Sequence, residues 1–370
     1  MNVLLCPLSD PGYLYPALAA GRELRRRGHT VHVLAGQPAE SAVTAAGLAM
    51  SAVADPTALS VAHWTVRGGE QYAAVARAVR RTRPDVLVTS VLCHGALVAA
   101  ESAGLPVVVL GLAAYLWPYR TGPADECGRA WRLAETLKHY ASVRETAGLG
   151  PRHDRFPDTP LLGTAFLLRG HPALEVPDAE LPDAVGHVGP CWWEPEPPVV
   201  EPLPDSKPLA YVHLGRTFGG TSLWPRLNAA FVSGTHRAVV ELGRSGAPEA
   251  APDADLIVGR RRWMGPLVER SDLVLTNATS APVLAALLHG KPLLVAPNGS
   301  EQQVLAAGCL RAGVARTLPE PGARAEALRA AVHDTARDHG LRARAEEVAG
   351  LLADGKSEAR AADAVESAAR

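Results

Sequence analysis

The stretch Ser271–Leu310, SDLVLTNATSAPVLAALLHGKPLLVAPNGSEQQVLAAGCL, reads as two successive units of strand, turn and helix. Polar residues are most concentrated at its two turns, 277–280 and 298–302. Each turn follows a short apolar run, as expected for a buried parallel strand, and opens an apolar helix. In an open parallel sheet ligands bind at the carboxyl ends of the strands, where the N–H groups of a helix N-terminus face an anion. The stretch therefore predicts a site for an anion such as a pyrophosphate.

The same order of strand, loop and helix extends to both sides of this stretch. Before it, the pattern predicts strands at 2–6, 30–34, 85–89 and 106–110, and helices at 14–28, 69–82, 95–102 and 129–147. Beyond residue 208 it predicts strands at 209–214, 238–242 and 255–258, a helix at 224–232, and two or three helices over 320–370. Alternating strands and helices indicate an α/β protein with doubly wound parallel sheets.

A proline-rich and acidic run, PCWWEPEPPVVEPLPDSKP over residues 190–208, divides the pattern into two halves. Such a run cannot hold a regular element, and 370 residues exceed one ordinary core. We therefore expect one Rossmann-like domain over residues 1–190, a linker over 191–207 and a second Rossmann-like domain over 208–352. A C-terminal helix over 353–370 could pack back on the first domain.

Composition and charge narrow the class of function. A net charge of −1 gives no reason to expect nucleic acid or an anionic membrane surface as a partner. The N-terminus lacks the basic region of a signal peptide, and no apolar run reaches the ~20 residues of a membrane span. Five scattered cysteines fit a reduced, cytoplasmic protein without a cysteine metal site. We interpret the Asp-x-Asp of residues 253–255 as a solvated turn.

Five segments carry a resemblance to a known family through their order and spacing. They are PLSDPGYLYPALAAGRELRRRGHTVHVLAG (7–36), RPDVLVTSVLCHGALVAAESAGLPVVVLG (83–111), HVGP (187–190), YVHLGRTFGG (211–220) and the stretch from Arg261 onward that contains Ser271–Leu310. Together they resemble the macrolide and antibiotic glycosyltransferases of family one, which have the GT-B fold of two facing Rossmann-like domains. The resemblance implies inverting, metal-independent transfer of a sugar from a nucleotide diphosphate to a small natural-product acceptor. The N-terminal domain would hold the acceptor, and the C-terminal domain would hold the nucleotide sugar. The nucleotide sugar is a co-substrate, and no other cofactor is expected. The chain could form a homodimer.

In the family that the chain resembles, a histidine is the catalytic base and an aspartate orients it. Tyr13 stands at the position of the histidine and Ser90 at that of the aspartate, so both usual residues are replaced. Tyrosine, with an ordinary pKa of about 10, is a poor base near neutral pH. Asp10 on the same loop and His94 after the next strand are substitutes. Each has a plain alternative: aromatic packing for Tyr13, turn chemistry for Asp10 and a structural role for His94.

On the donor side, the turn at 277–280 departs most from the family. Asn277 stands where the family has histidine, and the family's glycines are replaced. Asn277, Thr279 and Ser280 could still hold a phosphate with backbone amides and hydroxyls, or could merely cap the helix. The next turn keeps its pattern, since Glu301 and Gln302 match a pair that contacts the donor sugar, with helix capping as the alternative.

The resemblance suggests further candidates on both sides. Arg216 and Thr217 would contact the donor phosphates or sugar, and Trp263 lies near the base-stacking position. On the acceptor side the candidates are Gly12, Trp64, Ser90, Tyr115 and Trp117. The aromatic members of that set would form a wall for the acceptor or pack in the core.

These residues leave three interpretations of function open. The first is a glycosyltransferase of antibiotic biosynthesis with a non-standard base. The second is a catalytically degenerate homologue that assists a partner protein, because the base, its aspartate and the loop glycines are lost together. The third is a GT-B scaffold reused for another group transfer.

Overall fold

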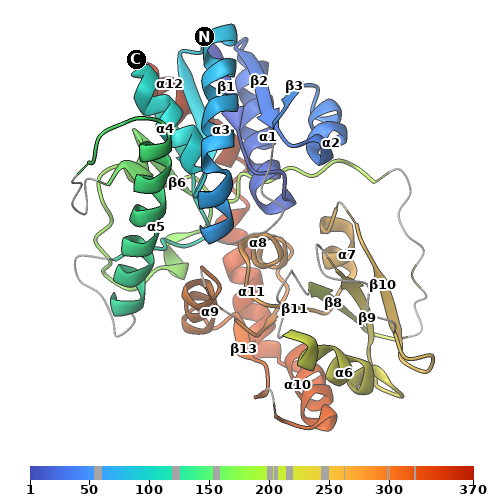
Figure 1. Cartoon of the computed structure of the whole chain (residues 1–370). Helices are drawn as coiled ribbons and strands as arrows, with labels where there is room; N and C mark the ends of the chain where they lie inside the picture. Colours follow the sequence, from blue (N-terminus) through green and yellow to red (C-terminus); the bar gives the residue numbers. More distant parts are fainter. Residues whose placement is uncertain are drawn as a thin grey trace. The chain divides into compact units, whose positions relative to one another are not determined.

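The structure is a computed structural model (Figure 1). It describes residues 1–53, 61–118, 126–152, 159–197, 203, 207–213, 220–242, 250–261, 263–297, 299, 301–320 and 322–370. For residues 61–66, 126–127 and 220–222 only the backbone is described. The chain divides into two compact units. The N-terminal unit comprises Met1–Pro172, Val176–Pro195 and Gly355–Arg370, and the C-terminal unit comprises Ala173–Glu175 and Glu196–Asp354.

The N-terminal unit is built on a parallel sheet with strand order β3-β2-β1-β4-β5-β6-β7. The strands are β1 (Asn2–Cys6), β2 (Thr30–Ala35), β3 (Ala49–Ala52), β4 (Val86–Ser90), β5 (Val107–Leu110), β6 (Ala165–Leu168) and β7 (Val185–His187). The central strands are continuous apolar runs because helices cover both faces of the sheet. The strand order reverses between β1 and β4, and such a switch point is where an open parallel sheet binds its ligand.

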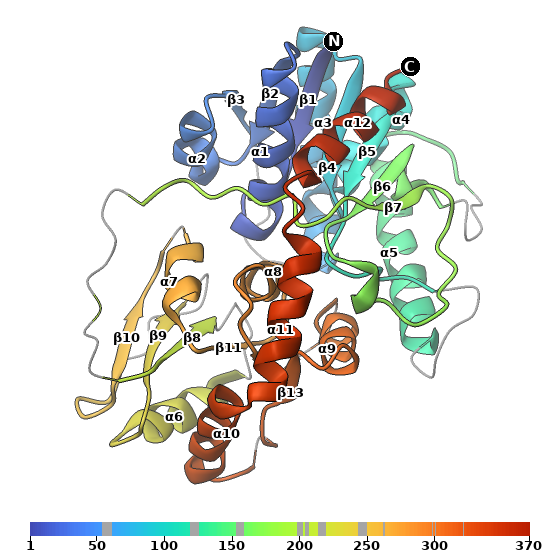
Figure 2. The same cartoon turned by 180° about the vertical axis from the view of Figure 1, so that it is seen from behind.

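Helices cover this sheet in two groups. They are α1 (Pro11–Arg26), α2 (Glu40–Ala45), α3 (Val61–Thr82), α4 (His94–Ala103), α5 (Glu126–Thr146) and α12 (Ser357–Ala368). Helix α3 packs on α4 and α5, whereas α1 packs on α12. Figure 2 shows α12, in red, beside the blue and cyan elements of the unit.

Helix α3 begins eight residues before the predicted start at residue 69, because a Gly-Gly pair lies inside the helix and does not begin it. A Cβ at Gly68 would lie 2.4 Å from Val143 Cγ2, and one at Gly69 would lie 2.7 Å from Thr146 Cγ2. Both partners belong to α5. The two glycines therefore let α3 and α5 approach closely, which outweighs their poor helix propensity.

Helix α12 completes the core of the N-terminal unit. Its Ala361, Ala362 and Val365 are fully buried in the same cluster as the apolar residues of α1. At its edge, the Arg27 guanidinium lies 2.6 Å from Asp363 Oδ1 and 3.1 Å from Glu366 Oε2. The last helix is thus fixed to α1 by apolar packing and ion pairs together.

The start of the predicted linker also belongs to this unit. Cys191 is fully buried, and the rings of Trp192 and Trp193 meet Tyr15 edge-on at centroid distances of 5.9 and 6.3 Å. The Arg22 guanidinium lies 4.9 Å above the Trp193 ring, a cation–π contact. Residues 191–195 therefore pack as part of the N-terminal unit rather than as a free connection.

The C-terminal unit has a second parallel sheet, with strand order β10-β9-β8-β11-β12-β13. The strands are β8 (Leu209–His213), β9 (Arg237–Glu241), β10 (Leu256–Gly259), β11 (Leu273–Thr276), β12 (Leu293–Val295) and β13 (Ala315–Thr317). The helices are α6 (Gly220–Phe231), α7 (Gly265–Arg270), α8 (Ser280–Leu288), α9 (Glu301–Arg311), α10 (Ala325–Arg337) and α11 (His339–Leu352). The order reverses between β8 and β11, giving a second switch point. The predicted fold class, two doubly wound Rossmann-like units, is confirmed.

Two further expectations concern metals and membranes. Asp255, the second carboxylate of the Asp-x-Asp sequence, lies 2.5 Å from Lys207 Nζ and 3.3 Å from Arg237 Nη2. It therefore belongs to an ion-pair cluster at the start of β10 rather than to a simple solvated turn.

Within the described residues, no helix is both long enough and apolar enough to cross a membrane.

Candidate functional site

In the N-terminal unit, the loop after β1 places Asp10, Gly12 and Tyr13 at the start of α1. Asp10 is the N-cap residue, and its carbonyl accepts hydrogen bonds from the N–H groups of Tyr13 (2.9 Å) and Leu14 (2.8 Å). Its carboxylate makes no capping hydrogen bond to the helix. Gly12 and Tyr13 are half-buried in the first turn. The carboxylate of Asp10 is therefore not used to cap α1.

The adjacent strand β4 ends at the same edge of the sheet. Cys6 pairs in register with Thr89, whose hydroxyl donates a hydrogen bond of 2.8 Å to the Cys6 carbonyl. Ser90 is the next residue and is fully buried. The structure thus brings Ser90 to the edge that carries Asp10 and Tyr13. Ser90 does not replace the aspartate of the family's histidine–aspartate pair, because its side chain offers a hydroxyl and no carboxylate.

His94 lies at the first position of α4, only 1% exposed, with its ring edge-on to Tyr140 at a centroid distance of 6.1 Å. Among the described residues, neither ring nitrogen has a hydrogen-bond partner. Burial, and secondly the charge of His139, lower the pKa of His94 to about 3. The imidazole is therefore neutral and a weak proton acceptor at neutral pH, which favours its structural interpretation.

Lowering the pH should destabilise the protein through His94. Its folded pKa of about 3 lies below the ordinary value of 6.5, so between these values the unfolded chain binds the extra proton. The free energy of unfolding then falls as the pH drops, by up to ~1.4 kcal/mol per pH unit from this residue. Urea unfolding of the wild type and His94→Gln at pH 7, 6 and 5 should show a shallower pH slope for the variant. Equal slopes would show that His94 is not protonated on unfolding.

Tyr115 and Trp117 follow β5 and lie in the core. They are 0% and 1% exposed, and their ring centroids are 6.0 Å apart at an interplanar angle of 82°. Both also meet Phe166 of β6 edge-on, at 6.4 and 5.5 Å. Of the two interpretations that the sequence left open, the structure favours core packing over an acceptor wall. The side chain of Trp64 lies outside the described residues.

In the C-terminal unit, the turn after β11 forms a network of its own. Asn277 is 1% exposed, and its Oδ1 accepts hydrogen bonds from the N–H (3.3 Å) and hydroxyl (3.2 Å) of Thr279. Thr279 is the N-cap of α8 but makes no side-chain cap, and Ser280 is the first helical residue, 4% exposed. The amide oxygen of Asn277 therefore organises the backbone that opens α8.

Ala278 in this turn adopts φ +64°, a left-handed conformation that favours glycine. The turn thus keeps a glycine-like backbone although its glycine is gone. Alanine in this conformation costs ~1 kcal/mol or more.

Replacing Ala278 by glycine should therefore change the free energy of unfolding by no more than about 0.5 kcal/mol, because the relief of ~1–2 kcal/mol of strain offsets both the extra freedom of glycine in the unfolded chain and the loss of a buried methyl group worth ~0.8 kcal/mol. Ala281→Gly is the matched control, since Ala281 lies in the first turn of α8 and should lose about 0.5–1 kcal/mol on this change. Urea unfolding of both variants measures the difference. If Ala278→Gly lost as much stability as Ala281→Gly, the left-handed backbone of Ala278 would not be strained.

The turn after β12 lies beside the turn after β11. Thr276 pairs in register with Val295, and the N–H of Ala296 donates a 2.9 Å hydrogen bond to the Thr276 carbonyl. Glu301 and Gln302 are half-buried at the start of α9, where the Gln302 N–H donates a 3.1 Å hydrogen bond to the Gly299 carbonyl. The structure therefore brings the two polar turns of Ser271–Leu310 to neighbouring strand ends.

The other donor-side candidates are Trp263, Arg216 and Thr217. Trp263 is half-buried just before α7. Arg216 and Thr217 lie outside the described residues.

One residue that sequence reasoning missed lies at the same edge. His213 ends β8 in register with Thr276 of β11 on one side and the buried Glu241 of β9 on the other. Burial lowers the pKa of His213 to about 4, so its imidazole is neutral near pH 7. The signal was present in the sequence: LAYVH is an apolar strand that ends in a single titratable residue.

Within the described part of the chain, no group of three or more His, Cys, Asp or Glu side chains could hold a metal ion.

Comparison with known proteins gives one similar curated sequence. No protein-family model matches the chain. It is 29% identical over 261 residues to 4'-demethylrebeccamycin synthase of Lentzea aerocolonigenes, a match that covers 60% of this chain and 59% of that protein. The chain therefore matches about three-fifths of the length of this relative.

Solved structures share the fold over the whole chain. The glycosyltransferase of kitacinnamycin superposes with a TM-score of 0.81 at 22% identity, covering 100% of this chain and 99% of that one. CalG4, the calicheamicin glycosyltransferase, gives 0.72 at 20% identity over 99% and 98%. The glycosyltransferase VinC, solved in complex with DTDP, gives 0.69 at 17% identity over 98% and 100%. At these identities the likeness establishes the two-domain GT-B fold.

Proposed function

We propose that this protein is a glycosyltransferase that moves a sugar from a nucleotide diphosphate to a small natural-product acceptor, as in antibiotic biosynthesis. The observation that carries the proposal is the pair of polar turns at neighbouring strand ends, Asn277–Ser280 before α8 and Gly299–Gln302 before α9. The similarity to 4'-demethylrebeccamycin synthase and to the solved glycosyltransferases of kitacinnamycin and calicheamicin supports it.

The first turn is the proposed diphosphate site. The opening N–H groups of a helix have no partner within the helix, and they carry the positive end of its dipole. The Asn277 network orients the backbone at α8, and the Ser280 hydroxyl can donate to a phosphate oxygen. The Thr279 hydroxyl, which donates to Asn277 Oδ1, can do so only by giving up that hydrogen bond. His213 lies beside Thr276, and its neutral imidazole adds one N–H donor at this edge. VinC, which has the same fold, was solved with DTDP.

The second turn is the proposed sugar site. Glu301 can accept hydrogen bonds from sugar hydroxyls, and the Gln302 amide can both donate and accept. Both side chains start from a helix whose first turn is held by the Gln302–Gly299 hydrogen bond. Hydroxyl-rich sugars require fixed polar groups of this kind.

Asp10 is the proposed general base in the N-terminal unit. Near neutral pH a carboxylate is already ionised, whereas ionising a tyrosine of ordinary pKa would cost ~4 kcal/mol. The pKa of about 3 and deep burial of His94 make it the weakest of the three candidates. In this mechanism Asp10 takes the proton from the acceptor as its oxygen attacks the anomeric carbon, and the nucleotide diphosphate leaves from the opposite side, so the configuration inverts. Tyr13 and Gly12 shape the same loop.

The proposal needs no metal ion. The leaving diphosphate would be stabilised by the N-terminus of α8, by the hydroxyls at its start and by Arg216 and Thr217, which follow β8 in the sequence. Charge that develops on a leaving group is stabilised by such fixed dipoles and donors.

Calorimetric titration with the diphosphates of uridine, thymidine, guanosine, adenosine and cytidine tests the proposal. Binding of at least one of them, lost with the matching nucleoside, is expected. No binding of any of the five would overturn the proposal.

Gln302→Leu separates the sugar site from the nucleotide site. The variant should raise KM for the nucleotide sugar about tenfold, because it removes one or two hydrogen bonds to the sugar worth ~1 kcal/mol each. Its Kd for the free nucleotide diphosphate should stay within twofold. Gln303→Leu, one position further along α9 on an exposed side chain, is the control. Equal effects on the nucleotide sugar and the free nucleotide would place Gln302 elsewhere.

A further inference from the structure

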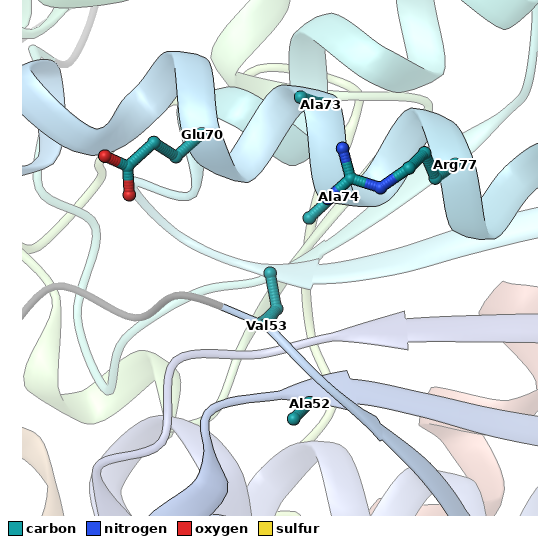
Figure 3. A pocket seen from close by; sticks show the side chains of 6 residues that line it. All are labelled: Ala52, Val53, Glu70, Ala73, Ala74 and Arg77. Atoms are coloured by element: carbon teal, nitrogen blue, oxygen red, sulfur yellow. The ribbon is translucent and has the colours of Figure 1, made fainter.

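A hollow of about 500 Å³ lies between the edge strand β3 and helix α3 of the N-terminal unit (Figure 3). Its lining residues are Ala52, Val53, Glu70, Ala73, Ala74 and Arg77. The volume falls within the range of small-molecule sites. None of the six residues is among the base, acceptor or donor candidates above, so the hollow is separate from the proposed transferase residues.

The spacing along α3 explains the shape of the hollow. Residues 70, 73, 74 and 77 recur at i, i+3, i+4 and i+7 and therefore share one face of the helix. Two alanines leave room in the middle of this face, and a charged side chain stands at each end. Figure 3 shows the Glu70 carboxylate below the helix at one end, the Arg77 guanidinium turned back toward Ala74, and Val53 pointing up at α3. The seven steps from Glu70 to Arg77 give a rise of about 10.5 Å along the helix.

The two charges have no partners in the described part of the chain. Glu70 and Arg77 are both exposed, and neither makes a hydrogen bond or ion pair with another described residue. Seven residues apart, they are beyond the i, i+3 or i, i+4 spacing at which helical side chains pair.

The neighbouring turn of α3 shows the contrast. Arg81 donates a 2.8 Å hydrogen bond to the Ser51 hydroxyl, which lies 3.0 Å from His32 Nε2. This chain of contacts ties α3 to β3 and β2 beside the Arg77 end of the hollow. Arg81 therefore holds α3 against β3 beside the hollow. The guanidinium of Arg77, one turn earlier, remains available to bind a ligand.

We propose that this hollow binds a zwitterionic small molecule with a flat apolar body, its ammonium group at Glu70 and its carboxylate at Arg77. The guanidinium can hold a carboxylate through two parallel hydrogen bonds. The methyl groups of Ala73, Ala74 and Val53 would contact one side of the apolar body and bury that part of its surface. The two opposite charges fix the direction in which the ligand lies. This site goes beyond glycosyl transfer and does not depend on it.

The probe is 4′-(aminomethyl)biphenyl-4-carboxylic acid, a rigid zwitterion whose length is close to the ~10.5 Å rise along α3 between Glu70 and Arg77. Ligand-observed NMR titration of the full chain gives its Kd. Glu70→Gln and Arg77→Gln should each weaken binding about fivefold, since exposed charge pairs are modest. Arg80→Gln, on the same helix but outside the lining, and Glu145→Gln on α5 should leave the Kd unchanged. The N-acetyl and methyl ester forms of the probe, each lacking one charge, should bind about fivefold more weakly to the wild type.

A charge exchange gives the decisive result. Arg77→Glu alone should abolish measurable binding, and the double variant Glu70→Arg/Arg77→Glu should recover it, because the zwitterion can bind in the reverse direction. Absence of binding to the wild type, equal Kd values in all four glutamine variants, or no recovery in the double variant would each overturn the proposal. Nucleotide diphosphate binding, measured on the same proteins, should not change, so this site and the proposed transferase activity can fail separately.

Discussion

Replacing Asp10 by asparagine should lower kcat for transfer to an acceptor hydroxyl by 10²- to 10⁴-fold, the usual contribution of a general base. Asparagine keeps the size of the side chain but cannot accept the proton. Because the carboxylate makes no capping hydrogen bond to α1, the change should leave the helix in place. Turnover is measured with any nucleotide-sugar and acceptor pair that the wild type uses.

Two controls make this result specific. Asp85→Asn removes a carboxylate from the same unit, where it accepts a 2.7 Å hydrogen bond from the Asn2 N–H, and should change kcat less than twofold. His94→Gln should cost less than tenfold, because a residue with a pKa of about 3 contributes little as a base. Nucleotide affinity should be equal in all three variants. If Asp10→Asn keeps more than a tenth of the wild-type kcat, Asp10 is not the base.

Replacing Trp117 by alanine should reduce the free energy of unfolding by about 3–5 kcal/mol. The ring is 1% exposed and meets both Tyr115 and Phe166 edge-on, so its removal leaves a cavity and breaks two aromatic contacts. Urea unfolding monitored by circular dichroism measures the loss.

Trp131 offers a matched control for Trp117. It lies on α5 with 65% of its surface exposed, so Trp131→Ala should change stability by no more than about 0.5 kcal/mol. Similar losses in both variants would refute the assignment of Trp117 to the core. A loss confined to Trp117 would support core packing over a role in the acceptor wall.

The sequence predicts most of the parallel sheets because their central strands are continuous apolar runs. The runs at β1, β4, β8 and β11 lie where the predicted strands do. The edge strand β3, Ala49–Ala52, could not be predicted in this way, because none of its four residues is fully buried and its sequence AMSA has no continuous run of large apolar residues. Apolar periodicity gives little signal for a short strand at the edge of a sheet.

Tertiary packing decides the features that local patterns misjudge. Gly68 and Gly69 are typical of a helix break, yet the close approach of Val143 and Thr146 places them inside α3. Residues 191–195 have the composition of a linker, yet their tryptophans pack on Tyr15. Neither contact can be known from residues near in sequence.

The candidate site was predictable to a similar extent. The residues at strand ends, from Asp10 to Gln302, lie where the alternating pattern places them, because chain order fixes the carboxyl edge of a parallel sheet. The burial of His94 and of Trp117 was not predictable, since it depends on α5 and β6. His213 was missed because its strand was interpreted only for its apolar residues.

The return of α12 to the N-terminal unit has a consequence for how the protein is made. Residues 1–195 leave the ribosome long before Ala361, Ala362 and Val365, which fill their core. While the C-terminal unit is being synthesised, the side of α1 that packs on α12 therefore stays uncovered and the core of the N-terminal unit stays incomplete. The N-terminal unit can therefore complete its core only after the C-terminal unit has been synthesised.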